Sequence, residues 1–544
     1  MKKYFPKTYK SIWILIAIVI LGFGFRVYRH HDFLRFNPDQ SRDASLAQDV
    51  VNGKEAWPLL GPKAGGTEFR LGPAFYYFEI FSAKIFGSTP DKMAYPDLLA
   101  SILSIILLYF FLREFFETNI ALISTALMAV SFYAIKYARF AWNPNSIPFY
   151  VLLFLYAILQ LSKKKKKRKW LWAVLIGLAA GIGIQLHSLL LFSFPVIFVV
   201  YFIYLFFKKN PAWKYAFLIV TLVLAINFPQ IISEAKTGGK NVKAFFKGIE
   251  TKSSRSGTYE DKLMLNTICH IQTHSFIVTS IGNDNKCDFI DVTKNIKKNN
   301  HKNNGLFKNI VLLSNIIFAT VFSLGGYILL FYFWYKEKEQ NKKRFLGIIL
   351  FYVATLFIIL IPLADEISFR FFLVTEFLPF VFLGLWIKFF KQQFKKWGWA
   401  MSIVIVAILM MINIHSISNN FSYLSGQRLA GRNGFEDIKL GEVEFMSRFI
   451  EEHSSNTKNI YVKGKANELF KIIRPIKYFT NEAGFNLNKL RKNSAINSND
   501  NLFLINITAS PKENNQLSQS ITDSYNILAS SRFARVRIYQ LEAK

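Results

Sequence analysis

The chain has 544 residues, of which 52% are hydrophobic, 17% are aromatic and only 19% are charged. These proportions exclude a disordered chain and argue against a water-soluble enzyme, because a soluble surface carries more charge. The 67 Lys and Arg outnumber the 35 Asp and Glu, giving a net charge of +32, and the two cysteines exclude a disulfide scaffold or a cysteine-based zinc ribbon. Because basic residues between apolar spans set membrane topology, we expect a lipid bilayer and no nucleic acid as the partner.

Apolar runs of roughly 16 to 22 residues recur along the chain, each ending in charged residues or in Pro, Asn or Gly. A helix of this length crosses the roughly 30 Å hydrocarbon layer of a bilayer. The fold class predicted is therefore an all-α polytopic membrane protein. The expected spans, about eleven in number, are 11–25, 95–112, 120–135, 147–161, 170–186, 189–207, 215–232, 310–335, 345–363, 371–389 and 399–414.

The basic residues of the short connections predict the orientation of these spans. With the N-terminus in the cytoplasm, the lysine-rich stretches 163–169, 336–344 and 388–396 all face the cytoplasm, whereas the short outer turns hold only Lys136, Arg139 and Arg370. This asymmetry follows the positive-inside rule. No small-residue cleavage site follows Phe25, so we expect the first run to stay as a membrane helix rather than to be cleaved as a signal peptide.

This topology places three long segments outside the cell membrane: 26–92, 233–308 and everything after about residue 416. The segment 233–308 is polar and rich in Asn and Lys, without a long period, and we expect it to be partly ordered. Cys269 and Cys287 both lie in this segment, on the oxidising side of the membrane. The sequence leaves open whether they form a disulfide bond or stay as two free thiols.

The composition changes after Ile414, where Asn, Ser, Lys and Glu become frequent and no further span occurs. Strands are predicted at 459–462, 502–507 and 536–541, and helices at 468–478 and near 516–521. The domain organisation expected is a transmembrane domain over 1–415 and a small extracytoplasmic α/β domain over 416–544.

Two aspartates stand out in the first outer loop. The segment after Phe36 predicts a short helix opened by Asp39 or Ser41 and closed by Gly53. Asp39 and Asp43 are then one turn apart and can converge at the outer mouth of the bundle. Alternatively, Asp39 only caps the helix and Asp43 only favours its first turn electrostatically.

Further along the same loop, Lys63 and Arg70 precede an aromatic run that includes Tyr76 and is suited to the headgroup plane. A cation at this depth can bind a lipid-linked phosphate. The simpler interpretation is that both side chains extend to ordinary phospholipid headgroups.

Other polar groups gather at the same membrane face. The turn 137–145 contains Arg139 and Asn143, His187 ends the fifth span, and Arg370 precedes the tenth. Taken singly, Asn143 fits a turn and His187 an interfacial histidine. An ion-coupled transporter places ionisable groups near the midplane instead, so their shared location favours a reaction site at the outer interface.

Several short motifs, in order, resemble the bacterial glycosyltransferase family 39 proteins. These proteins are relatives of dolichyl-phosphate-mannose protein mannosyltransferases and of the aminoarabinose transferase of lipid A, and they share the GT-C membrane fold. The matching motifs are Asp-Gln-x-Arg-Asp (39–43), Leu-Gly-Pro (71–73), Phe-Tyr-Tyr (75–77), Trp-Asn-Pro-Asn (142–145) and Gln-Leu-His (185–187).

The resemblance implies transfer of one sugar from a polyprenyl-phosphate donor to an extracytoplasmic acceptor, with inversion at the anomeric carbon. It implies Asp39 as the general base and Asp43 as an assisting carboxylate, although Arg70 lies in Arg-Leu-Gly-Pro where some relatives have Lys-Pro-Pro. Some relatives use a divalent metal, but no ligand cluster in this sequence demands one. The remaining residues implied are Arg70, Arg370 and Lys63 for the donor phosphate, and His187, Asn143, Arg139 and Tyr76 for the substrate pocket.

Two other functions stay open. A flippase or transporter for lipid-linked sugars would share the spans and the basic residues but would need no catalytic acid. A polymerase or ligase that uses diphosphate-linked glycans would instead place its essential arginines in a large outer loop. The sugar is not indicated, and the acceptor can be a protein, a lipid or a glycan.

Overall fold

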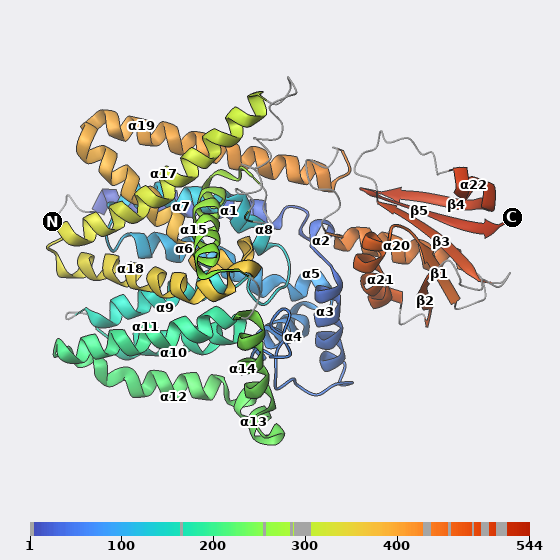
Figure 1. Cartoon of the computed structure of the whole chain (residues 1–544), viewed down its shortest axis with the longest axis horizontal. Helices are drawn as coiled ribbons and strands as arrows, with labels where there is room; N and C mark the ends of the chain where they lie inside the picture. The colour runs from blue at the N-terminus through green and yellow to red at the C-terminus, as the bar shows by residue number, and fades with distance from the viewer. Residues whose placement is uncertain are drawn as a thin grey trace.

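The computed structural model describes residues 5–163, 167–253, 257–282, 287, 306–427, 437–454, 459–480, 484–490, 500–507 and 519–544. The described chain forms a bundle of long helices with a smaller sheet-containing part at one end (Figure 1). The N-terminus lies at the opposite end of the bundle. We call the end of the bundle beside the sheet the loop face.

The bundle is built from apolar helices whose inner sides carry a large cluster of buried aromatic and aliphatic residues. Its helices are α1 (Phe5–Val27), α6 (Tyr95–Leu112), α7 (Thr118–Val130), α8 (Phe132–Ala138), α9 (Ile147–Ser162), α10 (Lys169–Leu186), α11 (Ser188–Phe207), α12 (Ala216–Ile226), α17 (Leu306–Lys336), α18 (Gln340–Leu360) and α19 (Leu378–Leu424).

Each of the predicted spans overlaps one or two of these helices. Among the described residues, seven helices are long and apolar enough to cross a membrane. Two bent pairs bring the number up to nine: α7 with α8, and the 3-10 helix η1 (Pro211–Tyr215) and α12 with α13 (Phe228–Thr237). The shorter α9 covers another predicted span, and α19 joins the last two across a break at Lys395, whose backbone is not helical. The chain is a multi-pass membrane protein.

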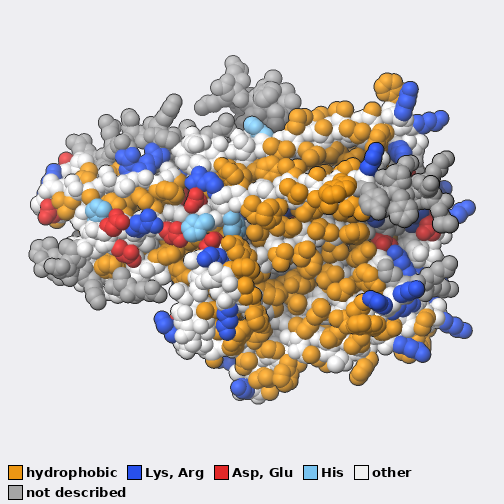
Figure 2. Space-filling model, turned by 180° about the vertical axis from the view of Figure 1, so that it is seen from behind, with side chains coloured by type: hydrophobic (Ala, Val, Ile, Leu, Met, Phe, Trp, Pro, Cys, Tyr) orange, Lys and Arg blue, Asp and Glu red, His pale blue; other side chains and the backbone are white. Residues whose placement is uncertain are grey.

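The side chains along the sides of the bundle differ in type from those at its ends. Hydrophobic side chains cover the bundle as a broad belt, and Lys and Arg gather at the end far from the sheet (Figure 2). Exposed residues of the belt include Trp13, Ile20, Phe217 and Ile328. Such a large exposed apolar surface is stable only in contact with lipid.

Short helices cover the loop face. They are α2 (His30–Phe33), α3 (Pro38–Val51), α4 (Ala74–Phe86), α5 (Pro90–Met93), α13 and α14 (Lys240–Ser253), with the 3-10 helices η2 (Ile361–Glu366) and η3 (Phe369–Thr375). The 3-10 helix η1 instead joins α11 to α12 at the opposite end of the bundle. The described part of the segment 233–308, expected to be a partly ordered loop, contains the end of α13, the amphipathic helix α14 and also α15 (Tyr259–Thr279). α15 packs against α17 and α19, and its Cys269 is disulfide-bonded to Cys287.

The C-terminal part is a five-stranded mixed sheet in the order β2-β1-β3-β5-β4, with β1 parallel to β2 and β3 and the other pairs antiparallel. The three predicted strands are confirmed as β1, β3 and β5, and part of the helix predicted near 516–521 lies outside the described residues. The elements are α20 (Leu440–His453), β1 (Asn459–Lys463), α21 (Ala466–Thr480), β2 (Asn486–Lys489), β3 (Asn501–Ile507), α22 (Gln519–Ser524), β4 (Tyr525–Phe533) and β5 (Val536–Ala543).

Candidate active site

A cleft of about 710 Å³ opens at the loop face. Its walls come from segments that are far apart in the sequence: the start of α3, the hairpin 62–71, the turn 142–144, the start of α11, one side of α14 and the start of η3. Five of the predicted site residues line this cleft, namely Asp39, Lys63, Asn143, His187 and Arg370.

Helix α3 places Asp39 at the edge of the cleft. The helix begins one residue before the predicted cap, because Pro38 fixes the first helical position and the preceding Asn37 is extended. The side chain of Gln40 accepts a hydrogen bond from the Asn37 backbone N–H at 3.2 Å. The N-cap is therefore Asn37 rather than Asp39 or Ser41, which leaves the Asp39 carboxylate available to the cleft.

The sheet-containing part also holds the start of α3. The side-chain amide of Asn37 donates to Asp437 Oδ1 at 2.6 Å, and its oxygen accepts from the Ile438 backbone at 3.2 Å. Next to these contacts, the Phe36 backbone N–H donates to the Ile438 carbonyl at 3.0 Å. Residues 437 and 438 thus fix the entry to the helix that carries Asp39.

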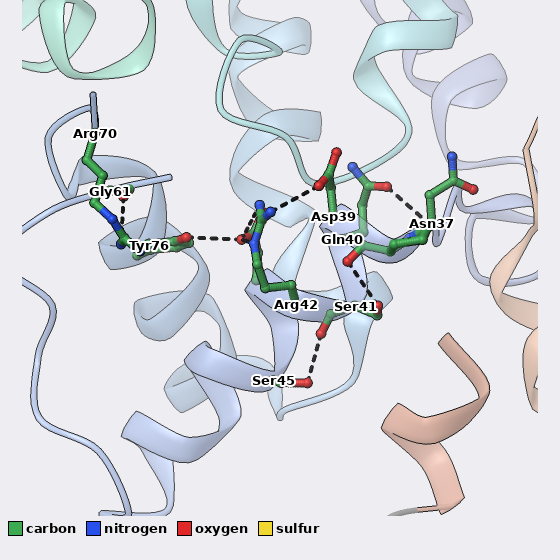
Figure 3. Close-up of polar contacts among 11 residues, drawn as sticks. Asn37, Asp39, Gln40, Ser41, Arg42, Ser45, Gly61, Arg70 and Tyr76 are labelled. Atoms are coloured by element: carbon green, nitrogen blue, oxygen red, sulfur yellow. Dashed lines mark hydrogen bonds and ion pairs between the residues drawn. The ribbon is translucent and has the colours of Figure 1, made fainter. Parts of the chain in front are cut away.

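Arg42 connects the two aspartates of the motif, and Figure 3 shows its contact with Asp39. Its guanidinium donates to Asp39 at 3.0 Å and to both oxygens of Asp43 at 2.8 and 3.0 Å. The side chain of Asp39 is 62% exposed, whereas that of Asp43 is 3% exposed and also accepts from the Tyr76 hydroxyl at 3.1 Å. Burial raises the pKa of Asp43 to about 6, against the opposing effect of Arg42.

This geometry gives the two carboxylates different positions. Asp39 faces the cleft, and Asp43 lies behind it and orients Arg42. Tyr76, predicted for the substrate pocket, does not line the cleft; it is buried and supports Asp43.

Among the described residues, no group of three or more His, Cys, Asp or Glu is suited to a metal ion. With Arg42 between both carboxylates, the residues here do not fit a divalent metal.

The predicted phosphate ligands separate into two groups. Arg370 lies over the rings of Trp142 and Phe371, 5.8 and 5.5 Å from their centres, and opens into the cleft. Lys63 also lines the cleft and pairs with Glu68 at 2.6 Å. Arg70 does not line the cleft: its guanidinium turns to the Gly61 carbonyl at 3.4 Å (Figure 3).

Arg139 is the other predicted pocket residue that does not line the cleft. It is buried, and its guanidinium donates to backbone carbonyls at the end of α1, including Phe25 at 2.9 Å and Tyr28 at 2.7 Å. A cation at a helix C-terminus satisfies carbonyls that have no partner within the helix. The position of Arg139 therefore serves the packing of α1.

The short motifs of the first half of the chain interlock beneath the cleft. Gln185 accepts from the Ala74 N–H at 3.0 Å at the start of α4, and Asn143 donates to the Leu186 carbonyl at 2.7 Å. His187 accepts from the Leu189 N–H at 3.1 Å and lies against Phe371. The close approach of Gln185 requires glycine at position 72, because a Cβ there would overlap the Gln185 side chain.

Replacing Gly72 with Ala is therefore expected to destabilise the site. The added methyl group displaces Gln185 from α4, and overpacking of this kind costs about 1–3 kcal/mol. Thermal unfolding of the purified protein in detergent measures the effect as a lower midpoint. Gly65→Ala is the matched control, since a Cβ at Gly65 meets nothing within 4 Å. Equal midpoints for the two variants would contradict the assignment.

Two lysines that were not singled out from the sequence also line the cleft. Lys243 and Lys247 lie on α14, inside the segment expected to be a loop. The sequence signal that could have indicated them is the amphipathic period of this segment. In it, apolar Val242, Phe245 and Phe246 alternate with Lys243 and Lys247.

Residues 71–232 match the model of the family described as Dolichyl-phosphate-mannose-protein mannosyltransferase. The matched stretch includes Gly72, Asn143, Gln185 and His187, and it begins after Asp39 and Asp43. No curated protein matches the chain.

Among solved structures, the chain is similar to three membrane proteins at low identity. An oligosaccharyltransferase from Archaeoglobus fulgidus in complex with Zn and sulfate is 13% identical, with a TM-score of 0.49, over 87% of this chain and 62% of that one. Apo ArnT from Cupriavidus metallidurans is 12% identical, with a TM-score of 0.44, over 98% of both chains. The Pmt1-Pmt2 protein O-mannosyltransferase complex of S. cerevisiae, bound to the sugar donor, is 13% identical, with a TM-score of 0.31, over 41% of this chain and 32% of that one.

The chain thus spans less than two thirds of the length of the archaeal oligosaccharyltransferase. The predicted resemblance is confirmed by the family match within the membrane part of the chain. Between residues 71 and 232, the chain is similar to the family described as Dolichyl-phosphate-mannose-protein mannosyltransferase.

Proposed function

We propose that the protein is a membrane glycosyltransferase that moves one sugar from a polyprenyl-phosphate donor to an extracytoplasmic acceptor, with inversion. The observation that carries the proposal is that the exposed carboxylate of Asp39 and the cation of Arg370 open into one cleft at the end of an apolar bundle. A donor with a long apolar chain and a phosphate needs such a place, where hydrocarbon and fixed cations meet.

The reaction follows from this arrangement. Asp39 accepts the proton of the acceptor hydroxyl as that oxygen forms a bond to the anomeric carbon. The bond from this carbon to the donor phosphate breaks on the opposite side, and its electron pair leaves with the lipid phosphate. Arg370 stabilises the charge that develops on the departing oxygen. Attack opposite to the leaving group inverts the configuration.

Arg42 and Asp43 hold Asp39 in place. Because Asp43 binds Arg42 through two oxygens, the guanidinium is fixed where one nitrogen reaches Asp39. A bidentate pair of this kind restricts orientation more than a single contact does. Asp43 is therefore a positioning residue.

Two independent features support an extracytoplasmic cleft. The Lys and Arg residues gather at the end of the bundle opposite to the loop face, as expected for the cytoplasmic side (Figure 2). The bridge between Cys269 and Cys287 belongs in an oxidising compartment. The orientation proposed is a cytoplasmic N-terminus and an extracytoplasmic sheet domain over 416–544, in the cell membrane.

Reconstitution with a radiolabelled polyprenyl-phosphate sugar tests this function against lipid transport. With a cell-envelope extract as the acceptor source, we expect the labelled sugar to move from the donor to another molecule as polyprenyl phosphate is released. A flippase would instead move the intact donor between leaflets, and intact donor after complete equilibration would refute the transferase.

The transfer rate is expected to fall when the pH decreases from 7 to 5. With a pKa of about 6, Asp43 is mostly ionised at pH 7 and takes up a proton at pH 5, so its charge pairing with Arg42 weakens on acidification. In Asp43→Asn we expect a low rate that does not change over this range. Rate profiles of the two proteins provide the check, and an unchanged midpoint in the variant would exclude Asp43 as its source.

A further inference from the structure

The wall that α14 contributes to the cleft carries two cations one helical turn apart. Lys243 and Lys247 both line the cleft, together with Gly248 and Thr251 of the same helix. Lys240 belongs to the same helix but not to the cleft lining. Like charges at this spacing repel each other, and an anion bound between them relieves the repulsion.

Contacts with the hairpin 62–71 hold α14 in this orientation. The side chain of Asn241 accepts from the Arg70 N–H at 2.8 Å and donates to the Arg70 carbonyl at 3.0 Å. One turn along the same face of the helix, Phe245 packs on Phe69, with ring centres 4.8 Å apart. Gly248 lies so close to Thr67 that a Cβ would come within 3.0 Å of its methyl group. The two lysines are therefore presented to the cleft by a fixed helix.

The charges in the cleft exceed what a donor phosphate requires. Arg42 is paired with Asp39 and Asp43, and Lys63 is paired with Glu68. Among the side chains that the structure describes, the remaining cations of the lining have no acidic partner; they are Lys243, Lys247 and Arg370. A donor phosphodiester carries a single negative charge, which Arg370 can balance.

We infer that Lys243 and Lys247 bind a second phosphate, and that the acceptor is a phosphate-bearing molecule. A phosphate monoester carries about −1.5 to −2 charges at neutral pH and offers several acceptor oxygens, which suits two ammonium groups better than a neutral hydroxyl does. This phosphate does not react. It docks the acceptor so that a neighbouring hydroxyl faces Asp39. The inference rests on the proposed transferase function and names its acceptor class.

Binding of glycerol phosphate to the full-length protein tests the inference. The protein in detergent is first saturated with polyprenyl phosphate, which occupies the donor subsite, and is then titrated with glycerol phosphate by calorimetry. We expect glycerol phosphate to bind and unphosphorylated glycerol not to bind. In the double variant Lys243→Gln/Lys247→Gln, the affinity for glycerol phosphate should fall about tenfold or more, with the affinity for polyprenyl phosphate unchanged. Lys240→Gln is the matched control and should behave as the parent protein.

Three outcomes would overturn the inference. If polyprenyl phosphate blocks the binding of glycerol phosphate, or if the double variant loses polyprenyl phosphate, the lysines serve the donor. If glycerol phosphate binds equally well to the double variant, its site lies elsewhere. If glycerol phosphate does not bind, but the double variant binds vesicles of anionic phospholipid less tightly than the parent, the lysines contact bilayer headgroups. Failure of the transferase proposal is distinct, because the labelled donor would then stay intact in the reconstitution assay, whether or not glycerol phosphate binds.

Discussion

Replacing Asp39 with Asn is expected to lower the rate of sugar transfer by about 10²- to 10⁴-fold, the usual contribution of a positioned general base. The amide keeps the size of the side chain but takes up no proton from the acceptor hydroxyl. Because Asp39 is exposed at the first turn of α3 and does not cap the helix, the variant should fold and insert normally. Initial rates with a labelled polyprenyl-phosphate donor measure the loss.

Asp49→Asn is the matched control for this experiment. Asp49 lies on the same helix as Asp39 but does not line the cleft, so its replacement should leave the rate unchanged. Undiminished transfer in Asp39→Asn, with normal amounts of protein in the membrane, would remove Asp39 from the mechanism.

Arg370→Gln is expected to lower kcat by about 10²- to 10³-fold, which is typical of the loss of one group that stabilises charge in a transition state. The negative charge on the lipid phosphate increases as the sugar leaves, so the loss should appear mainly in kcat and less in KM. Arg370→Lys should retain part of the rate, since it keeps the charge but loses the planar guanidinium that lies over Trp142.

Arg29→Gln serves as the control for Arg370, because Arg29 is a cation of the loop face that does not line the cleft. Steady-state kinetics of the purified proteins provide the comparison. If Arg370→Gln raised only KM, Arg370 would bind donor and transition state equally well and would not assist departure of the phosphate.

The membrane spans could be predicted because they leave a strong signal in the sequence. Runs of apolar residues long enough to cross a bilayer are rare in water-soluble proteins. Even a broken span could be predicted, since the bend between α7 and α8 interrupts the helix without adding many polar residues. Three strands of the sheet were predictable for a similar reason, because β3 is apolar over most of its length.

The elements of the second long loop could not be predicted in the same way. α15 buries polar residues, among them Asn266, His270 and His274, so its composition resembles that of a solvent-exposed loop. α14 has an amphipathic period, but nothing in the sequence shows that this helix returns to the cleft. The contacts that bring it there are made with Arg70 and Phe69, far away in the chain.

The candidate site shows what motifs can and cannot indicate. The motifs and the predicted topology indicated that Asp39, Asn143, His187 and Arg370 share one membrane face, and the structure brings these side chains to one cleft. A motif does not show where a side chain points, however. Arg139 is adjacent to the turn 142–144 in sequence, yet it turns to the end of α1.

Photo-cross-linking of a polyprenyl phosphate analogue, with the labelled peptides mapped by mass spectrometry, tests most directly whether the lipid-linked donor binds in this cleft. We expect cross-links on peptides that contain Arg370 and Lys63, and their loss when natural polyprenyl phosphate is added in excess. A second cavity of about 640 Å³ lies between α1 and α19, lined by Gly24 and Ile417 among others. Competed cross-links confined to that cavity, with none at Arg370 or Lys63, would contradict the account.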